Sequence, residues 1–171
     1  MRAAVGLIVC ATACGRIGFD PSGSSMPGTD GATDAATTML DGGAGVIPCA
    51  DMNLGSAMGQ RIAMGSTQAA GNDTSACSGD GDDVTIGWFA PVAATYRIDL
   101  CESNFGFDTV LYVRDGGCTG PQLACDDDSC GLVGIQAEVS VSLAAGQGIV
   151  IVVDGKTPVV GGNFQLAITQ L

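Results

Sequence analysis

The chain has 171 residues, which is room for one domain of ordinary size. Six Lys and Arg residues stand against 18 Asp and Glu residues, so the formal charge is −12. Nucleic-acid binding needs clustered basic side chains, and no nucleic acid is therefore expected as a partner. Histidine is absent, which excludes Ser-His and Cys-His mechanisms and His-ligated metals. Eight cysteines are too many for a reducing compartment unless they bind metal, so the composition indicates export.

Residues 1–13 have the composition of a secretory signal. One positive charge at Arg2 precedes an apolar or small run over residues 3–13, which is too short to cross about 30 Å of hydrocarbon as a helix. The run Ala11-Thr12-Ala13-Cys14 resembles a bacterial lipobox, with Ala11 where that motif usually has Leu. The resemblance implies removal of residues 1–13, acylation of Cys14 and a membrane anchor made of lipid. A plain cleaved signal peptide is the alternative.

Residues 14–48 predict a flexible linker behind that anchor. The stretch is rich in Gly, Ser, Asp and Ala and lacks apolar periodicity, so it cannot bury enough surface to offset the entropy of ordering it. The folded domain is therefore expected over residues 49–171. We expect it to lie outside the cytoplasm, on the outer membrane or the cell surface.

The rest of the chain is rich in strand patterns and lacks a capped helical stripe. Apolar and polar residues alternate strictly over Ile135–Leu143, and the run Ile149–Val153 is apolar throughout, which is typical of a strand buried on both faces. The other expected strands are Gln60–Met64, Val84–Phe89, Thr95–Leu100, Thr109–Val113 and Asn163–Thr169. Turn residues separate them at Asp115-Gly116-Gly117, Ala145-Gly146, Asp154-Gly155 and Gly161-Gly162. Seven or eight short strands predict an all-β, antiparallel sandwich of jelly-roll type.

Several of these segments resemble the bacterial pre-peptidase C-terminal domain. The match spans roughly residues 82–168, which is most of the folded part. The segments that carry it are Cys101-Glu102-Ser103, Phe107–Val113, Leu123–Asp127, Leu143–Gln147, Val152–Gly155 and Gly162–Leu166. The family often has Asn where this chain has Asp126. The resemblance implies a small secreted β-sandwich, of a kind often appended to proteases, chitinases or surface lipoproteins and implicated in binding polymers.

Six cysteines remain when Cys14 carries lipid and Cys10 leaves with the signal: Cys49, Cys77, Cys101, Cys118, Cys125 and Cys130. An even number in an exported domain predicts disulfides, and six cysteines allow about fifteen connectivities. Zinc is disfavoured, because no two of the six have CxxC spacing. Cys118 and Cys125 flank a short loop, which favours a bridge across one hairpin. Cys49 and Cys77 bracket the first strand, which leaves Cys101 and Cys130.

Clustered aspartates are the only candidate chemistry. Asp126, Asp127 and Asp128 lie between two cysteines, and Asp80, Asp82 and Asp83 form a second cluster. Calcium prefers six to eight hard oxygen ligands, and no basic residue lies between Arg114 and Lys156 to neutralise the first cluster. Asp126, Asp127 and Asp128, with Asp108 from the preceding strand, are the candidate calcium ligands. The alternative is a solvated loop built of Asx-turns.

No catalytic motif accompanies these residues, so we expect a protein that is not an enzyme. Trp88, Phe89, Tyr96 and Tyr112 lie in strand runs, where packing in the core is favoured over stacking on sugars. The leading hypothesis is a lipid-anchored adhesion module that binds an extracellular polysaccharide or protein, with calcium as its one candidate cofactor. A structural envelope protein without a soluble ligand is the alternative.

Overall fold

The structure, a computed structural model, describes residues 45–171 apart from 73, 75, 105, 131–133 and 159–160. The expected signal, Cys14 and the expected linker up to residue 44 lie outside the described residues. The last linker residues, 45–48, pack with the domain: Ile47 is buried and its backbone N–H donates to Asn53 Oδ1 at 2.7 Å. Within the described chain there is no helix long and apolar enough to cross a membrane.

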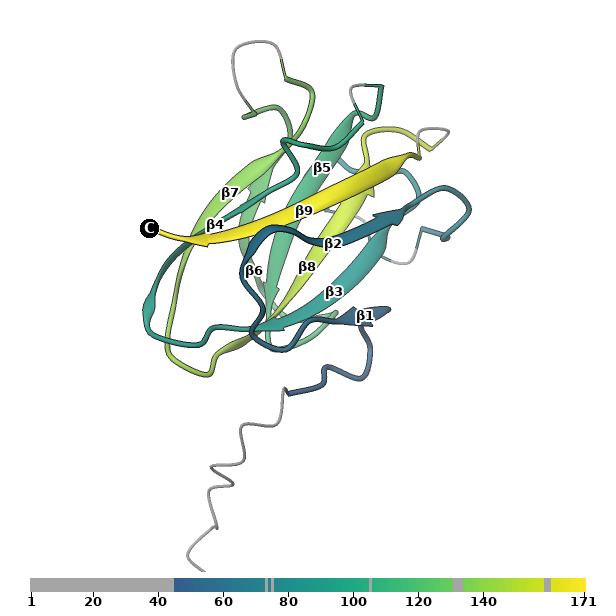
Figure 1. Ribbon diagram of the computed structural model, residues 1–171. Coiled ribbons are helices and arrows are strands. Elements are labelled where there is room, and N and C mark those ends of the chain that lie inside the picture. The colour runs from purple at the N-terminus through teal and green to yellow at the C-terminus, as the bar shows by residue number, and fades with distance from the viewer. Residues whose placement is uncertain (1–44, 73, 75, 105, 131–133, 159–160) are drawn as a thin grey trace, which may run out of the picture. The chain divides into compact units, whose positions relative to one another are not determined.

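The described residues form two β-sheets stacked face to face (Figure 1). The strands are β1 (Met52–Asn53), β2 (Gly59–Ser66), β3 (Val84–Phe89), β4 (Ala94–Asp99), β5 (Thr109–Asp115), β6 (Gln122–Asp126), β7 (Glu138–Leu143), β8 (Gly148–Gly155) and β9 (Asn163–Gln170). Sheet A has the order β1-β3-β8-β5-β6, and sheet B has the order β2-β9-β4-β7. The all-β sandwich is thereby confirmed.

The alternation read from the sequence sets the faces of sheet B. Val139, Val141 and Leu143 of β7 point into the sandwich, while Ser140 and Ser142 are exposed. Because successive side chains of a strand point to opposite faces, one side of this sheet faces the core and the other faces solvent.

Sheet A differs because both of its faces are covered. Ile149, Ile151 and Val153 of β8 enter the main core between the sheets, whereas Val150 and Val152 belong to a second apolar cluster on the outer face. This second cluster is completed by Ile47, Val110 and Tyr112 and is covered by Ala50, Ala76, Cys77, Phe89 and Cys118. The prediction that Ile149–Val153 is a central strand buried on both faces is confirmed.

Two strands and one pairing were not expected. β6 has only five residues, and β1 has only two and pairs in parallel with β3, so the sandwich is not wholly antiparallel. The prediction of a turn at Asp154-Gly155 was wrong, because both residues belong to β8 and are buried.

Three disulfides join the six cysteines: Cys49–Cys118, Cys77–Cys125 and Cys101–Cys130. The two local pairings expected from the sequence, Cys118–Cys125 and Cys49–Cys77, were wrong. Cys125 lies opposite Tyr112 within the β5–β6 ladder, whereas Cys118 lies beyond the end of β5 in the connecting turn. At about 3.3 Å per residue the two are too far apart along the hairpin to be bridged.

Two of the bridges fasten covering segments onto sheet A. Cys49 belongs to the chain ahead of β1, and Cys77 belongs to the strap, a name we give to residues Ala76–Asp83. The third bridge connects the end of β4 in sheet B with the connection between β6 and β7. The covalent links therefore serve the cover of sheet A and one edge of the sandwich.

Candidate functional site

Three of the four predicted calcium ligands meet at one place. Asp108 directly precedes β5, and Asp127 and Asp128 follow β6, which pairs with β5. One carboxylate oxygen from each of the three lies within 4.8 Å of the others. The hairpin thus brings residues about twenty positions apart in the sequence to one end of sheet A.

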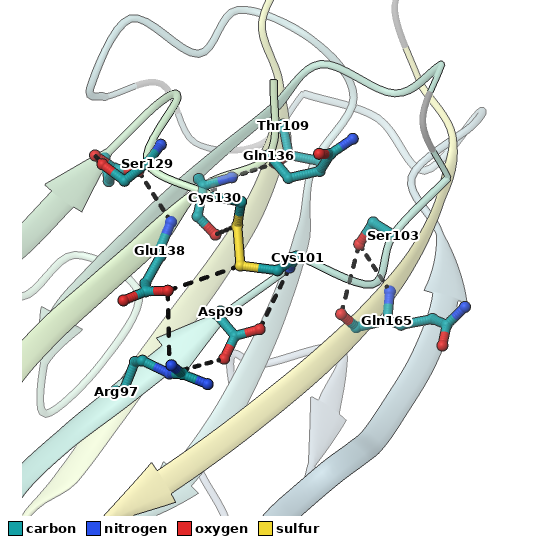
Figure 2. The surroundings of a disulfide bond; sticks show 12 residues. Arg97, Asp99, Cys101, Ser103, Thr109, Ser129, Cys130, Gln136, Glu138 and Gln165 are labelled. Atoms are coloured by element: carbon teal, nitrogen blue, oxygen red, sulfur yellow. Dashed lines mark hydrogen bonds and ion pairs between the residues drawn. A yellow bond between two sulfur atoms is a disulfide. The ribbon is translucent and has the colours of Figure 1, made fainter. Parts of the chain in front are cut away.

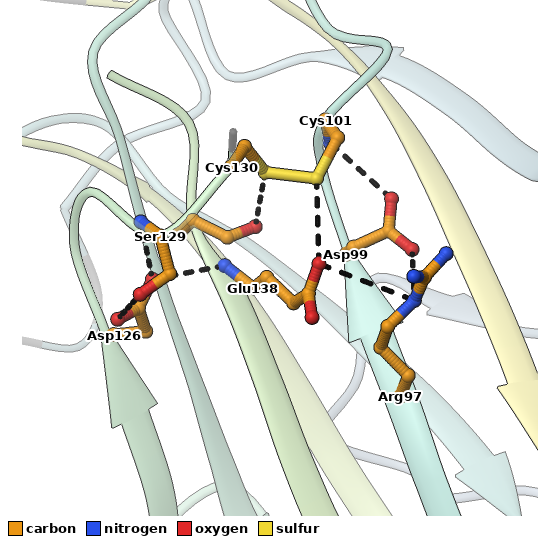
Figure 3. A network of polar contacts seen from close by, with 8 residues as sticks. Arg97, Asp99, Cys101, Asp126, Ser129, Cys130 and Glu138 are labelled. Atoms are coloured by element: carbon orange, nitrogen blue, oxygen red, sulfur yellow. Dashed lines mark hydrogen bonds and ion pairs between the residues drawn. A yellow bond between two sulfur atoms is a disulfide. The ribbon is translucent and has the colours of Figure 1, made fainter. Parts of the chain in front are cut away.

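Asp126 has another role. Its carboxylate accepts hydrogen bonds from the Ser129 N–H at 3.1 Å, the Ser129 hydroxyl at 2.6 Å and the Glu138 N–H at 2.9 Å (Figure 3). These contacts form an Asx-type turn and tie the end of β6 to the start of β7. The structure therefore places Asp126 outside the cluster of the other three aspartates.

Lys156 partly neutralises the cluster of Asp108, Asp127 and Asp128. Its ammonium group forms an ion pair with Asp127 Oδ2, and its backbone N–H donates to the Asp108 carbonyl at 3.1 Å. Burial raises the pKa of Asp108, the charge of Asp128 raises it further, and Lys156 opposes both effects. No basic residue lies between Arg114 and Lys156 in the sequence, and Lys156 itself closes on the loop, which the sequence pattern does not predict.

The arrangement has part of what a divalent cation needs. Asp108 Oδ1 and Asp127 Oδ1 are inaccessible to solvent and have no hydrogen-bond partner among the described residues. Calcium takes six to eight oxygens, so three carboxylates supply a minority of the ligands and carbonyls or water supply the rest. A cation entering here competes with the Lys156 ammonium for Asp127.

The second acidic cluster is dispersed by the fold. Asp82 Oδ2 accepts from the Ala69 N–H at 2.7 Å, and Asp83 is buried and accepts from the N–H and hydroxyl of Thr74 at 2.8 and 3.1 Å. Asp80 is exposed on the strap. The three side chains therefore serve separate contacts.

The outer face of sheet B carries a polar network beside the third disulfide (Figure 2). Arg97 Nε lies 3.2 Å from Asp99 Oδ2 and 4.0 Å from Glu138 Oε2, and Asp99 Oδ1 accepts from the Cys101 N–H at 3.3 Å. Asp99, Glu138 and Cys101 could together hold a metal by distance alone. The Cys101 sulfur is in a disulfide, so it has no thiolate to offer a cation.

Hydroxyl and amide groups continue from this network over β7, β4 and β9, and β2 adds the exposed apolar side chain of Met64. Arg97 lies between Ser140 of β7 and Thr169 of β9, and Met64 of β2 lies opposite Gln165 of β9. Thr95 and Ser142 share a hydrogen bond of 2.8 Å. We call this surface the open face, because Ser140, Ser142 and Met64 on it are exposed, while Asp99 beside the disulfide is only 3% exposed.

Aromatic side chains are missing from the described part of the open face. Trp88, Tyr96, Tyr112, Phe107 and Phe164 are fully buried, and Phe89 packs on the outer apolar cluster of sheet A. The expectation that Trp88, Tyr96 and Tyr112 serve the core is confirmed. The described residues of the open face therefore offer hydrogen-bonding and charged groups, with Met64 as an exposed apolar side chain.

Comparison with known proteins identifies one solved structure with a related arrangement. No protein-family model matches the chain, and no curated protein matches its sequence. A crystal structure of the pre-peptidase C-terminal domain of a collagenase from Bacillus anthracis is similar at 13% identity and a TM-score of 0.48, covering 70% of this chain and 96% of that one. The assignment of the chain as a disulfide-linked β-sandwich rests on its own strands and bridges.

Proposed function

We propose that the protein is an extracytoplasmic binding module, held on the outer membrane or the cell surface by acylated Cys14, whose open face engages an extracellular polysaccharide or protein. The observation that carries the proposal is the unequal cover of the two sheets. Two disulfides fasten segments over the outer face of sheet A, whereas the outer face of sheet B presents polar side chains to solvent.

The geometry of the open face suits an extended partner. Four strands spaced by about 4.8 Å span about 14 Å, so a polymer chain crossing them meets several rows of side chains in turn. Ser140, Arg97 and Thr169 form one such row across three strands. Hydroxyl and guanidinium groups donate to carbonyl and hydroxyl oxygens, which both polysaccharides and proteins supply in series.

Export and anchoring have separate support. Three disulfides form and persist in oxidising compartments, which agrees with a domain outside the cytoplasm. The proposed anchor rests on the run ending at Cys14 and on the sum of several acyl chains, each buried methylene contributing about 0.8 kcal/mol. Mass spectrometry of the N-terminus tests it: an unmodified terminus, or a Cys14→Ala protein that stays in the membrane, contradicts it.

The proposal includes a calcium ion bound by the carboxylates of Asp108, Asp127 and Asp128. Three converging carboxylates with two desolvated oxygens favour a cation there, and Lys156 lowers the affinity by holding Asp127. We expect calcium to stabilise the ends of β5 and β6 rather than to touch the polymer, because the cluster lies on sheet A and not on the open face.

The experiment is a pull-down of the full chain on insoluble cellulose, chitin, peptidoglycan and collagen fibres, each with calcium and with EDTA. Retention on at least one polymer is expected. Retention on none, with a folded protein at the membrane, would instead favour a structural envelope protein without such a ligand.

A further inference from the structure

A carboxyl group lies buried near the end of β8, at a position where the sequence predicts a turn. Asp154 of β8 is fully buried, and its side chain shares the outer face of sheet A with Val150 and Val152. One oxygen, Oδ1, accepts from the Gly81 N–H at 3.2 Å. The other, Oδ2, has no solvent contact and no hydrogen-bond partner among the described residues.

A second buried carboxyl faces it across the sheet. The β3–β8 ladder begins at the pair Val84 and Val153, so the next position along each strand brings Asp83 beside Asp154 on the outer face. Asp83 is only 3% exposed. Carboxylates that face each other across strands repel, and burial strengthens that repulsion because little water screens it.

Among the residues that the structure describes, the other groups around Asp154 do not supply a positive charge. The strap contributes the carboxylate of Asp80, and β5 contributes the phenol of Tyr112, whose oxygen lies 2.5 Å from the Thr74 hydroxyl. Burial, together with Asp154 and Asp83, raises the pKa of Tyr112 to about 12, so the phenol stays neutral. Of the nearest basic residues, Lys156 is paired with Asp127 and Arg114 lies over the Tyr112 ring.

We propose that Asp154 carries a proton in the folded domain and that this proton holds the strap on sheet A. A neutral carboxyl removes the repulsion from Asp83, and its hydroxyl is a hydrogen-bond donor that the carboxylate lacks. Loss of the proton leaves two negative charges facing each other, Asp154 below the strap and Asp83 at its end, and loosens the strap.

The strap packs closely enough against Asp154 to respond to a change in the protonation of this side chain. A Cβ atom added at Gly79 would overlap the Asp154 carboxyl, and the Gly81 N–H also donates to the Gly155 carbonyl at 2.9 Å. Cys77 and Ser78 adopt the left-handed backbone conformation, with φ of 59° and 76°, which non-glycine residues rarely adopt. The segment is therefore under strain, and its seating depends on the contacts below it and on the Cys77–Cys125 bridge.

The pH dependence has a definite sign. Burial, with a further contribution from Asp83, raises the pKa of Asp154 from its ordinary 3.8 to about 7, while the N–H groups of Gly81 and Gly155 oppose the rise. Between these two values the seated state holds a proton that the opened state releases. The seated strap is therefore most stable below pH 3.8, and it loses stability as the pH rises to about 7.

The first test is a carbon-13 NMR titration of the side-chain carboxyls in the full chain, with EDTA present. The resonance missing from Asp154→Asn identifies Asp154, and its midpoint is expected near pH 7. Asp83→Asn should lower that midpoint. Asp82→Asn is the matched control, because it removes the same charge from the same segment without touching Asp154. A midpoint near 4, or one that Asp83→Asn leaves in place, overturns the proposal.

The second test follows the strap itself by hydrogen exchange at the Gly79 and Gly81 amides. After correction for base catalysis, protection is expected to fall about tenfold or more between pH 5.5 and pH 8 in the native chain, because each unit of pKa shift is a factor of ten in the opening equilibrium. The amides of β9 serve as the internal control and should not respond. Protection that is constant with pH, or that falls equally in Asp154→Asn, contradicts the proposal even where the variant is less stable.

Discussion

The outer faces of the two sheets differ in how far other parts of the domain cover them. On sheet A, Tyr112, Val150 and Val152 are covered by segments that two disulfides hold in place. On sheet B, Ser140 and Ser142 face solvent directly. The difference shows where this small domain obtains added stability: it buries a second apolar cluster on the outer face of sheet A and leaves side chains on the outer face of sheet B in contact with solvent.

The largest expected contrast comes from placing the same charge on each face. Val152→Asp buries an unpaired carboxylate under the cover of sheet A and should destabilise the fold by about 3–5 kcal/mol or prevent folding. Ser142→Asp places it on the open face, where the change should stay within about 0.5 kcal/mol. Urea unfolding of both variants measures the contrast. Equal costs would show that the open face is covered in solution.

Removal of a disulfide should cause the next largest loss of unfolding free energy. The chain-entropy model gives about 4.4 kcal/mol for Cys49–Cys118, with a separation of 69 residues, and about 3.6 kcal/mol for Cys101–Cys130, with a separation of 29. We expect paired Cys→Ala replacements to cost 2–4 kcal/mol each, the first pair more than the second.

Peptide mapping of the non-reduced protein checks the pairing on which this rests. It should recover Cys49 linked to Cys118 and Cys77 linked to Cys125. A Cys118–Cys125 peptide would refute the cover of sheet A.

A third contrast concerns the effect of calcium on the two acidic regions, the cluster of Asp108, Asp127 and Asp128 and the strap with Asp82. Calcium at a hundredfold excess over its Kd should raise the stability by about 2.7 kcal/mol through the cluster of Asp108, Asp127 and Asp128. Asp128→Asn should reduce that gain, and Asp82→Asn should leave it unchanged. Thermal melting with calcium and with EDTA is the measurement. Equal midpoints in the native chain would leave the cluster as a solvated loop neutralised by Lys156.

The smallest effect is expected on the open face itself. The hydrogen bond between Thr95 and Ser142 is exposed, so both hydroxyl groups can form hydrogen bonds with water instead. Ser142→Ala should change the unfolding free energy by less than about 0.5 kcal/mol. A cost above 1 kcal/mol in denaturant titration would mean that this face takes part in the packing of the domain.

Much of the sandwich could be predicted because its strands carry their own pattern. The alternation in Ile135–Leu143 and the apolar run in Ile149–Val153 report one buried face and two buried faces directly. β6 was missed because Gln122–Asp126 is short and mostly exposed and takes its register from β5.

The predictions that failed concern contacts that the alternation of apolar and polar residues does not report. Cys118 and Cys125 are near in sequence, yet each is bridged to a distant residue, over separations of 69 and 48, because Cys49 and Cys77 belong to the cover of sheet A. The convergence of Asp108 with Asp127 and Asp128 was anticipated, whereas the separate role of Asp126 depends on Ser129 three residues later. A turn was predicted at Asp154 because this residue follows an apolar run and precedes a Gly. Only the pairing of β8 with β3 shows that Asp154 is buried beside Asp83.

The most direct test of the account is polymer binding by a variant of the open face. Ser140→Arg places a long charged side chain beside Arg97, at the β7 end of the row formed with Arg97 and Thr169, while Ala145→Arg makes the same change of charge in the exposed turn between β7 and β8. On whichever of cellulose, chitin, peptidoglycan or collagen retains the native chain, Ser140→Arg should lose at least about tenfold in affinity and Ala145→Arg should bind normally. Undiminished binding by a folded Ser140→Arg protein would contradict the assignment of the open face.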